Sequence, residues 1–259
     1  MEQFLFILLI LAFAVLIGST IGFGDSLILI PLVAIFLDIR TAIVLAGFWS
    51  IFLSILNAIK YRNNIDKSFV KKHVGFGILG AIIGSLLIVI APLQWLEIFM
   101  AVFIMVYVIT KIREMRKIKA IKEENIELLN STIDPVKSIP NFFIYSGGFS
   151  YGLLSGLIGA AGPINVALLE RTGHEREEFI GTFAIISVII GTIKTGIYLG
   201  KNLFPIELLV VYLLGFIVIF VMTRIGHWLT PKIPKEKFKI IVLLLLIVIS
   251  IRLVLSTLL

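Results

Sequence analysis

Long apolar segments constrain this chain more than any other feature of its sequence. They cover residues 4–22, 25–37, 41–59, 74–91, 93–110, 141–158, 163–170, 179–199, 206–223 and 238–258. A helix needs about 20 apolar residues to cross the roughly 30 Å of bilayer hydrocarbon, and most of these segments approach that length. Because they are continuous and do not alternate with polar residues, they predict membrane helices and not the strands of an outer-membrane barrel.

The composition supports an all-α integral membrane protein. Hydrophobic residues make up 59% of the 259 residues and charged residues 15%, whereas soluble domains carry about a quarter charged residues. The net charge of +7 comes from short loops between the segments, so we expect no nucleic-acid partner. The chain has no cysteine, which excludes disulfides and thiolate metal sites. The first apolar segment lacks a basic leader, and we expect it to be a retained helix rather than a signal peptide.

Two of the segments, 25–37 and 163–170, are too short to cross a bilayer comfortably. Each follows a full-length segment across a glycine-rich turn, in the sequences IGFGDSLILIP and GLIGAAGPI. Each pair therefore predicts a broken helical hairpin that returns to the side on which it began. The sequence does not decide whether the hairpin arms cross the bilayer fully.

The distribution of basic residues predicts which side of the membrane each loop faces. If the hairpins return and the other six segments cross, one side receives the loops 60–73, 111–140, 171–178 and 224–239, with 19 of the 23 Lys and Arg. The opposite side receives only Arg40, Lys201 and Arg252, and Lys194 lies within a segment. Basic residues concentrate on the cytoplasmic side. We therefore expect a multi-pass protein of the cytoplasmic membrane with both termini outside the cytoplasm.

The two halves of the sequence match at an offset of about 137 residues. Gly22 aligns with Gly159, Asn57 with Lys194 and Tyr61 with Tyr198, while Arg40 falls within one residue of Arg176. A hairpin plus three crossings is an odd number, so the second copy would be inverted, as in many transporters. This predicts about eight membrane segments, in a first repeat at 1–110, a charged cytoplasmic linker at 111–140 and a second repeat at 141–259.

The glycine turns are the first candidate for a binding site. A helix that starts inside a bilayer presents unpaired N–H groups and a partial positive charge, which together favour an anion. The residues concerned are Gly22, Gly24, Asp25 and Ser26 in the first turn and Gly159, Gly162 and Pro163 in the second. The alternative is that small residues such as Gly152 and Gly156 only bring helices together.

Asp25 and Lys194 are the ionisable residues of most interest. Asp25 either caps the helix that follows it or carries a coupling proton, with Lys194 as a possible partner. A lysine at the centre of a membrane helix costs about 2.5–3.5 kcal/mol and so usually has a task. Lys194 either binds the anion or takes part in proton coupling, unless its side chain extends to the nearby membrane surface.

Further polar residues lie on the same segments. Asn57 matches Lys194 in the first half, and Asn165 closely follows the second turn, so both are candidate ligands. Trp95 is expected at the membrane interface, whereas Trp49 either lines a cavity or packs. His73, His174 and His227 are placed in or beside cytoplasmic loops, away from the turns. We find no ATP-binding motif and no grouping of ligands for a metal, and we expect no cofactor.

The motifs GFGDSLILIP and SGLIGAAGP resemble those of the TauE/SafE sulfite exporter family. Other sequence features that resemble this family are YRNNID at 61–66, the Gly181-Thr182 pair, and Lys194 followed by IYLGKN at 197–202. The resemblance extends over almost the whole chain. It implies a secondary transporter for small anions such as sulfite or organosulfonates, with protons as the coupling ion. Asp25, Ser26 and Ala161 replace glycines of the family pattern, which would alter the size or charge of the ligand.

The sequence thus predicts an exporter of a small anion that works by alternating access, with no enzyme activity. Its expected site comprises Gly22, Gly24, Ser26, Asn57, Gly159, Gly162, Pro163, Asn165 and Lys194, with Asp25 and Lys194 as candidates for proton coupling. A passive anion channel and a non-transporting membrane subunit remain alternatives. The substrate, the oligomeric state and the direction of transport do not follow from the residues.

Overall fold

The structure is a computed structural model, and it describes residues 2–124, 139–174, 176–229 and 247. Within these residues the chain is helical, with turns between the helices and no strand. The elements are α1 (Glu2–Ile21), α2 (Asp25–Val33), α3 (Ile39–Lys60), α4 (Lys67–Ile90), α5 (Leu93–Glu124), α7 (Asn141–Ile158), α8 (Gly162–Arg171), α9 (Arg176–Gly200), the 3-10 turn η1 (Ile206–Leu208) and α10 (Leu209–Leu229).

Six of these helices, α1, α3, α4, α5, α9 and α10, are long and apolar enough to cross a membrane. The predicted all-helical membrane class is therefore confirmed. The short segments of the sequence became the short helices α2 and α8. The expected last segment, 238–258, lies outside the described residues apart from residue 247. Helix α5 continues beyond its apolar part to Glu124, so the linker begins as a helical extension.

Aspartate side chains fix where two of the long helices begin. The Asp38 carboxylate accepts a hydrogen bond from the Thr41 backbone N–H at the start of α3, at 3.0 Å. Asp66 does the same for Phe69 N–H at the start of α4, at 2.9 Å. Such caps satisfy donors that have no partner within the helix. The cap at Asp66 explains why α4 begins seven residues before its apolar segment.

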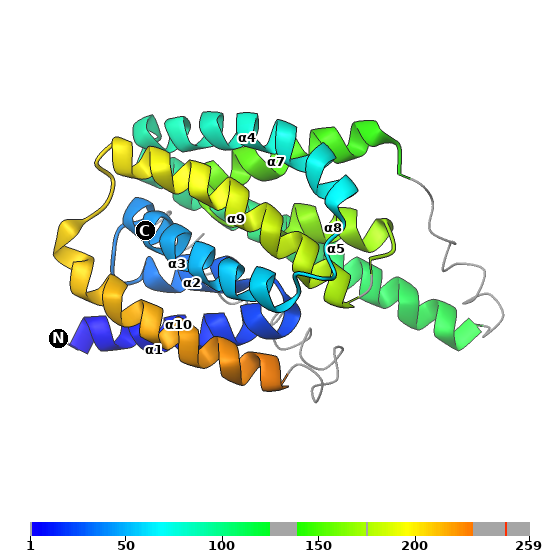
Figure 1. The fold of residues 1–259 in the computed structure, drawn as a ribbon, viewed down its shortest axis with the longest axis horizontal. Coiled ribbons are helices and arrows are strands. Elements are labelled where there is room, and N and C mark those ends of the chain that lie inside the picture. Colours follow the sequence, from blue (N-terminus) through cyan, green and yellow to red (C-terminus); the bar gives the residue numbers. More distant parts are fainter. Residues whose placement is uncertain (1, 125–138, 175, 230–246, 248–259) are drawn as a thin grey trace.

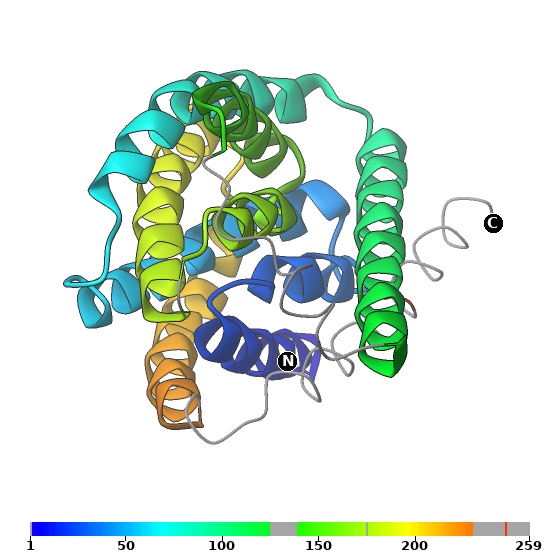
Figure 2. The same ribbon diagram turned by 90° about the vertical axis from the view of Figure 1, so that its right-hand side faces the viewer.

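The helices pair between the two halves of the chain. Helix α4 packs along α7, and α1 packs along α10. Figure 1 shows these pairs on opposite edges of the molecule, with α3 and α9 packed against each other between them. Figure 2 shows α5 on the flank of the bundle. Each half therefore supplies helices to both edges.

The contact between α4 and α7 depends on glycine. A Cβ atom at Gly80 would collide with the backbone of Phe149, and one at Gly84 with the backbone of Leu153. In the other direction, a Cβ at Gly152 would collide with the backbone of Gly77, and one at Gly156 with that of Ser85. Small residues allow membrane helices to approach this closely. The interpretation of Gly152 and Gly156 as packing residues is confirmed.

Both hairpins return to the end at which they started. In the first, the Gln3 side chain at the start of α1 donates a hydrogen bond to Phe36 O beyond α2, at 2.5 Å. In the second, Asn141 at the start of α7 accepts a bond from Lys72 on the first turns of α4. His174, beyond α8, contacts Asp66 at that same end of α4.

The outer surface is apolar and suits a lipid environment. Large hydrophobic side chains are exposed on the outer faces of α1, α4, α5 and α10, among them Leu9, Leu79, Val102 and Leu213. Trp95 is 68% exposed at the start of α5, as an interfacial residue would be. Trp49 is buried against Tyr212 and Gly215, so it packs between helices.

Candidate functional site

The two glycine turns meet at one cavity in the middle of the bundle. Its walls come from α2, α3, α7 and α9 and from both turns. It encloses about 630 Å³ of space not filled by atoms, including its open mouth. The predicted site residues that line it are Gly22, Gly24, Asp25, Ser26, Asn57, Gly159, Gly162 and Lys194.

Backbone conformation explains the glycines of the turns. Gly22 and Gly24 both have φ of 96°, and Gly159 has φ of 74°. This left-handed region is disfavoured for residues with a Cβ atom. The turns end α1 and α7 and let α2 and α8 start at the cavity wall, so the positive ends of two helix dipoles face the cavity.

Asp25 and two serines form a polar group on one wall. Ser50 on α3 donates a hydrogen bond to Asp25 Oδ2 at 2.7 Å, and Ser26 lies 3.3 Å from the same oxygen. The two serine hydroxyls are 2.9 Å apart. The interpretation of Asp25 as the cap of α2 is wrong, because Gly24 holds that position and no side chain caps the helix. The carboxylate is turned toward α3 and the cavity.

Lys194 lines the cavity from α9. Its side chain is only 4% exposed, and Nζ approaches the Ser155 hydroxyl at 3.2 Å and the Ser155 carbonyl at 3.4 Å. The side chain therefore does not extend to the membrane surface. Among the described residues it forms no ion pair, with Asp25 or with any other carboxylate. A buried ammonium group with neutral partners is suited to receive an anion.

Asn57 connects the cavity to a histidine on α10. Its amide oxygen lies 2.7 Å from His227 Nε2. The histidines were expected in or beside the cytoplasmic loops and away from the turns, and neither His227 nor His73 lines the cavity, although each contacts a residue that does. His73 is fully buried on α4, where its ring lies 5.6 Å from the ring of Tyr151, a cavity residue. Both helices extend further into the basic loops than their apolar segments indicate, which brought these histidines inside the bundle.

Two predicted site residues, Pro163 and Asn165, do not line the cavity. Pro163 lies in the first turn of α8, where its missing N–H costs nothing. Asn165 is fully buried, and its amide lies against the imidazole of His73. Asn165 lies three residues, or about 4.5 Å along the α8 axis, beyond Gly162, at a point where α8 is packed inside the bundle and no longer borders the cavity.

The sequence did not single out several polar residues of the cavity. Tyr151 and Ser155 lie one turn apart on α7, and Tyr151 shares a hydrogen bond of 2.9 Å with Ser187 on α9. A separation of four residues puts two helical side chains on the same face. That spacing of Tyr151 and Ser155 in an otherwise apolar helix is the signal that could have identified them.

The cavity therefore combines one buried cation, one carboxylate held by hydroxyls and two helix N-termini. This set of groups can bind a small anion and can hold a proton beside it. Among the described residues, the cavity wall carries no histidine and no second carboxylate.

Comparison with known families agrees with these features. The sequence model of the family described as "Sulfite exporter TauE/SafE" matches residues 7–253. This range includes both glycine turns and both halves of the chain. No curated protein and no solved structure matches the chain. Because the match extends over nearly the whole sequence, the chain belongs to the TauE/SafE sulfite exporter family.

Proposed function

We propose that the protein exports a small anion, such as sulfite or an organosulfonate, across the cytoplasmic membrane and that this transport is coupled to the movement of protons. Family membership supports a membrane exporter of anions. The observation that carries the proposal is the convergence of Lys194, Asp25 and both helix N-termini on one cavity. Lys194 and the helix N-termini bind the anion, and Asp25 carries the proton.

Pairs of cavity residues separated by 137 positions support a site between two related repeats. In each pair one residue comes from the first half and the other from the second, and both line the cavity. The pairs are Gly22 and Gly159, Gly24 and Ala161, Asp25 and Gly162, Gly47 and Ala184, Ser50 and Ser187, Ser54 and Gly191, and Asn57 and Lys194. A pseudo-twofold axis that passes through the cavity explains this pattern.

The contacts of the hairpins support an inverted arrangement of repeats 1–110 and 141–259. The two ends of the first hairpin meet next to Asp38, at the start of α3. At this same end of α3, Arg40 donates a hydrogen bond to Ala91 O. The two ends of the second hairpin lie near Asp66, just beyond the other end of α3. Inverted repeats that meet at a central site are the usual basis of alternating access. In this proposal the halves rock against each other and expose the cavity to each side in turn.

Protonation of Asp25 would allow an anion to bind in a cavity that contains this carboxylate. An ionised Asp25 repels an anion in the same cavity, whereas a protonated Asp25 does not. Binding of the anion would therefore favour uptake of a proton at Asp25, and release of one would favour release of the other. This is a coupling free energy between two ligands, and it is reciprocal.

The test uses purified protein in liposomes with an imposed pH gradient. Sulfite is added first, then short sulfonates and carboxylates, while anion flux and internal pH are both followed. Saturable flux of one anion accompanied by a pH change supports the proposal and identifies the substrate class. Flux without a pH change indicates a channel, and the absence of flux with every anion contradicts the proposed function.

Lys194→Ala provides the sharper version of this test. Loss of a hydrogen bond to a charged group costs about 1.5–3 kcal/mol, so we expect transport to fall by roughly 10- to 100-fold. Lys201→Ala is the matched control, since Lys201 lies exposed just beyond the end of α9. Thermal unfolding of both variants in detergent checks that they remain folded. Full transport by a folded Lys194→Ala variant would rule out this role for Lys194.

A further inference from the structure

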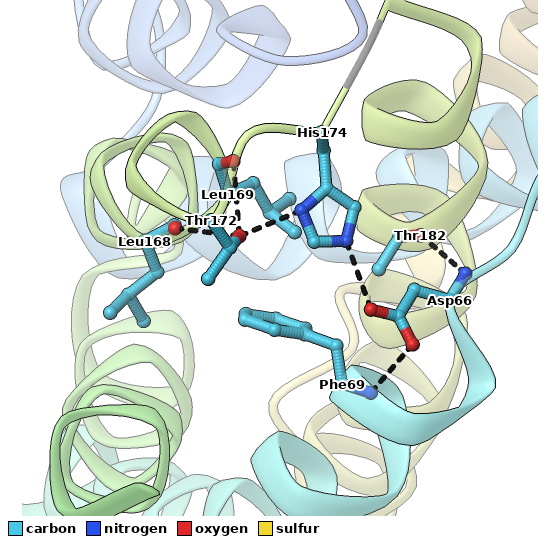
Figure 3. Close-up of polar contacts among 7 residues, drawn as sticks. All are labelled: Asp66, Phe69, Leu168, Leu169, Thr172, His174 and Thr182. Atoms are coloured by element: carbon cyan, nitrogen blue, oxygen red, sulfur yellow. Dashed lines mark hydrogen bonds and ion pairs between the residues drawn. The ribbon is translucent and has the colours of Figure 1, made fainter. Parts of the chain in front are cut away.

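We propose a second site, for a divalent transition-metal cation, at the end of the bundle where the loop between α3 and α4 meets the loop between α8 and α9. Its ligands are Asp66, His174 and Glu178, whose candidate ligand atoms all lie within 4.8 Å of one another. Figure 3 shows Asp66 and His174 facing each other across the two loops. This site is separate from the cavity and does not depend on the proposed transport.

The hydrogen bonds of Thr172 determine where His174 carries its proton. Thr172 Oγ1 lies 3.0 Å from Leu168 O and 3.1 Å from Leu169 O, and its single proton goes to these carbonyls. Toward His174 Nδ1, 2.7 Å away, the same oxygen must then accept a hydrogen bond. Nδ1 therefore carries the N–H, and in a neutral imidazole Nε2 presents a lone pair.

This lone pair faces a carboxylate oxygen. His174 Nε2 and Asp66 Oδ2 are 3.3 Å apart, and the His174 side chain is only 3% exposed. Nε2 is buried and makes no hydrogen bond. Two acceptors this close repel each other unless a positive charge lies between them. Two ligands about 2.1 Å from a tetrahedral metal ion are roughly 3.4 Å apart, so the observed separation fits a shared cation.

The surroundings hold these ligands in place. Asp66 Oδ1 caps α4 through Phe69 N–H, and Asp66 N–H donates to Thr182 Oγ1 on α9 at 2.9 Å, so Oδ2 is left to face His174. Thr172 orients the imidazole through Nδ1, which is the way outer partners commonly orient a metal-binding histidine. Figure 3 shows these supporting contacts around the pair.

Glu178 supplies the third ligand and a route from solvent. It lies on the first turns of α9 and also lines a surface hollow whose other residues are Asn63, Asn64, Ile65, Arg176 and Glu177. A cation can therefore reach the ligands without crossing the core. One imidazole nitrogen with two carboxylates suits Zn²⁺ or Mn²⁺ better than Mg²⁺ or Ca²⁺, which prefer oxygen ligands alone.

The experiment measures Zn²⁺ binding to the purified, tag-free protein in detergent by isothermal titration calorimetry, after treatment with a chelator. Co²⁺ absorption spectra in the visible range report the coordination geometry. We expect one Zn²⁺ per chain at this site. The Asp66→Asn, His174→Ala and Glu178→Gln variants should each bind Zn²⁺ at least about 10-fold more weakly. Asparagine caps helices as well as aspartate does, so Asp66→Asn should preserve the start of α4.

Glu177→Gln is the matched control, because it removes the same charge from the neighbouring position of α9. Its Zn²⁺ affinity should stay within about twofold of the unmodified protein. Thr172→Val should weaken Zn²⁺ binding about 10-fold, since it removes the group that orients His174. If the unmodified protein binds no Zn²⁺, or if all the variants bind it equally well, the proposal is wrong.

Discussion

Asp25 is the residue whose chemistry most affects the proposed mechanism. Its carboxylate has hydroxyl partners, Ser50 and Ser26, and no basic partner among the described residues. Gly18 makes room for it, because a Cβ at that position would lie 2.8 Å from Asp25 Cβ. In the mechanism that we propose, this half-buried carboxylate is the group that carries the coupling proton.

The Asp25→Asn variant tests this role directly. Asparagine keeps the size and accepts the Ser50 hydrogen bond, but it cannot exchange a proton. We expect anion flux down its own gradient to persist, while the protons moved per anion fall at least about 10-fold. Paired measurements of anion flux and internal pH in liposomes give this ratio. Asp38→Asn, at the cap of α3, serves as control, and an unchanged ratio in Asp25→Asn would rule out coupling through this carboxylate.

The sequence predicted positions in the cavity better than it predicted contacts. Glycine turns and polar residues inside apolar segments follow from the cost of polar groups in lipid, and this reasoning placed Asp25, Asn57 and Lys194 at the cavity. The pairing of Asp66 with His174 could not be predicted in this way. It depends on how the ends of α4, α8 and α9 meet, and no local pattern encodes that meeting.

At the level of elements, the contact between α4 and α7 leaves the least room for side chains and so restricts the sequence most. The backbones touch where each helix lacks side chains, so even a methyl group must push the helices apart. Gly77, Gly80 and Gly84 on α4 are three or four residues apart and share one face. Gly148, Gly152 and Gly156 on α7 are four residues apart and do the same. Each stripe is visible in the sequence, but which two stripes meet is visible only in the structure.

The Gly80→Ala variant should therefore be destabilised by about 1–3 kcal/mol, since overpacking a tight contact costs this much. Gly75→Ala is the matched control on the same helix, because no atom lies within 4 Å of a Cβ there. Alanine at position 75 should even stabilise α4 slightly, since glycine is the weaker helix former. Thermal unfolding in detergent, followed by size-exclusion chromatography, measures both effects. Equal stability of the two variants would contradict the close approach of α4 and α7.

At the level of the whole molecule, the charged loops predict which end faces the cytoplasm. The chain contains no cysteine, so single-cysteine variants need no prior change to the sequence. We expect a membrane-impermeant thiol reagent to modify Asn63→Cys only from the cytoplasmic side and Lys201→Cys only from outside. Intact cells and inverted vesicles provide the two sides. Labelling of both positions from the same side would show that the charge distribution does not set this topology.

The pairing of α4 with α7 and of α1 with α10 also affects the order in which the chain can assemble during synthesis. When the first five helices have left the ribosome, the glycine face of α4 and the inner face of α1 still lack the helices that cover them. Neither edge of the bundle is complete until the second half has been inserted. We therefore expect the first half to remain an open intermediate in the membrane, which a chaperone or the insertion machinery must protect until α7 and α10 arrive.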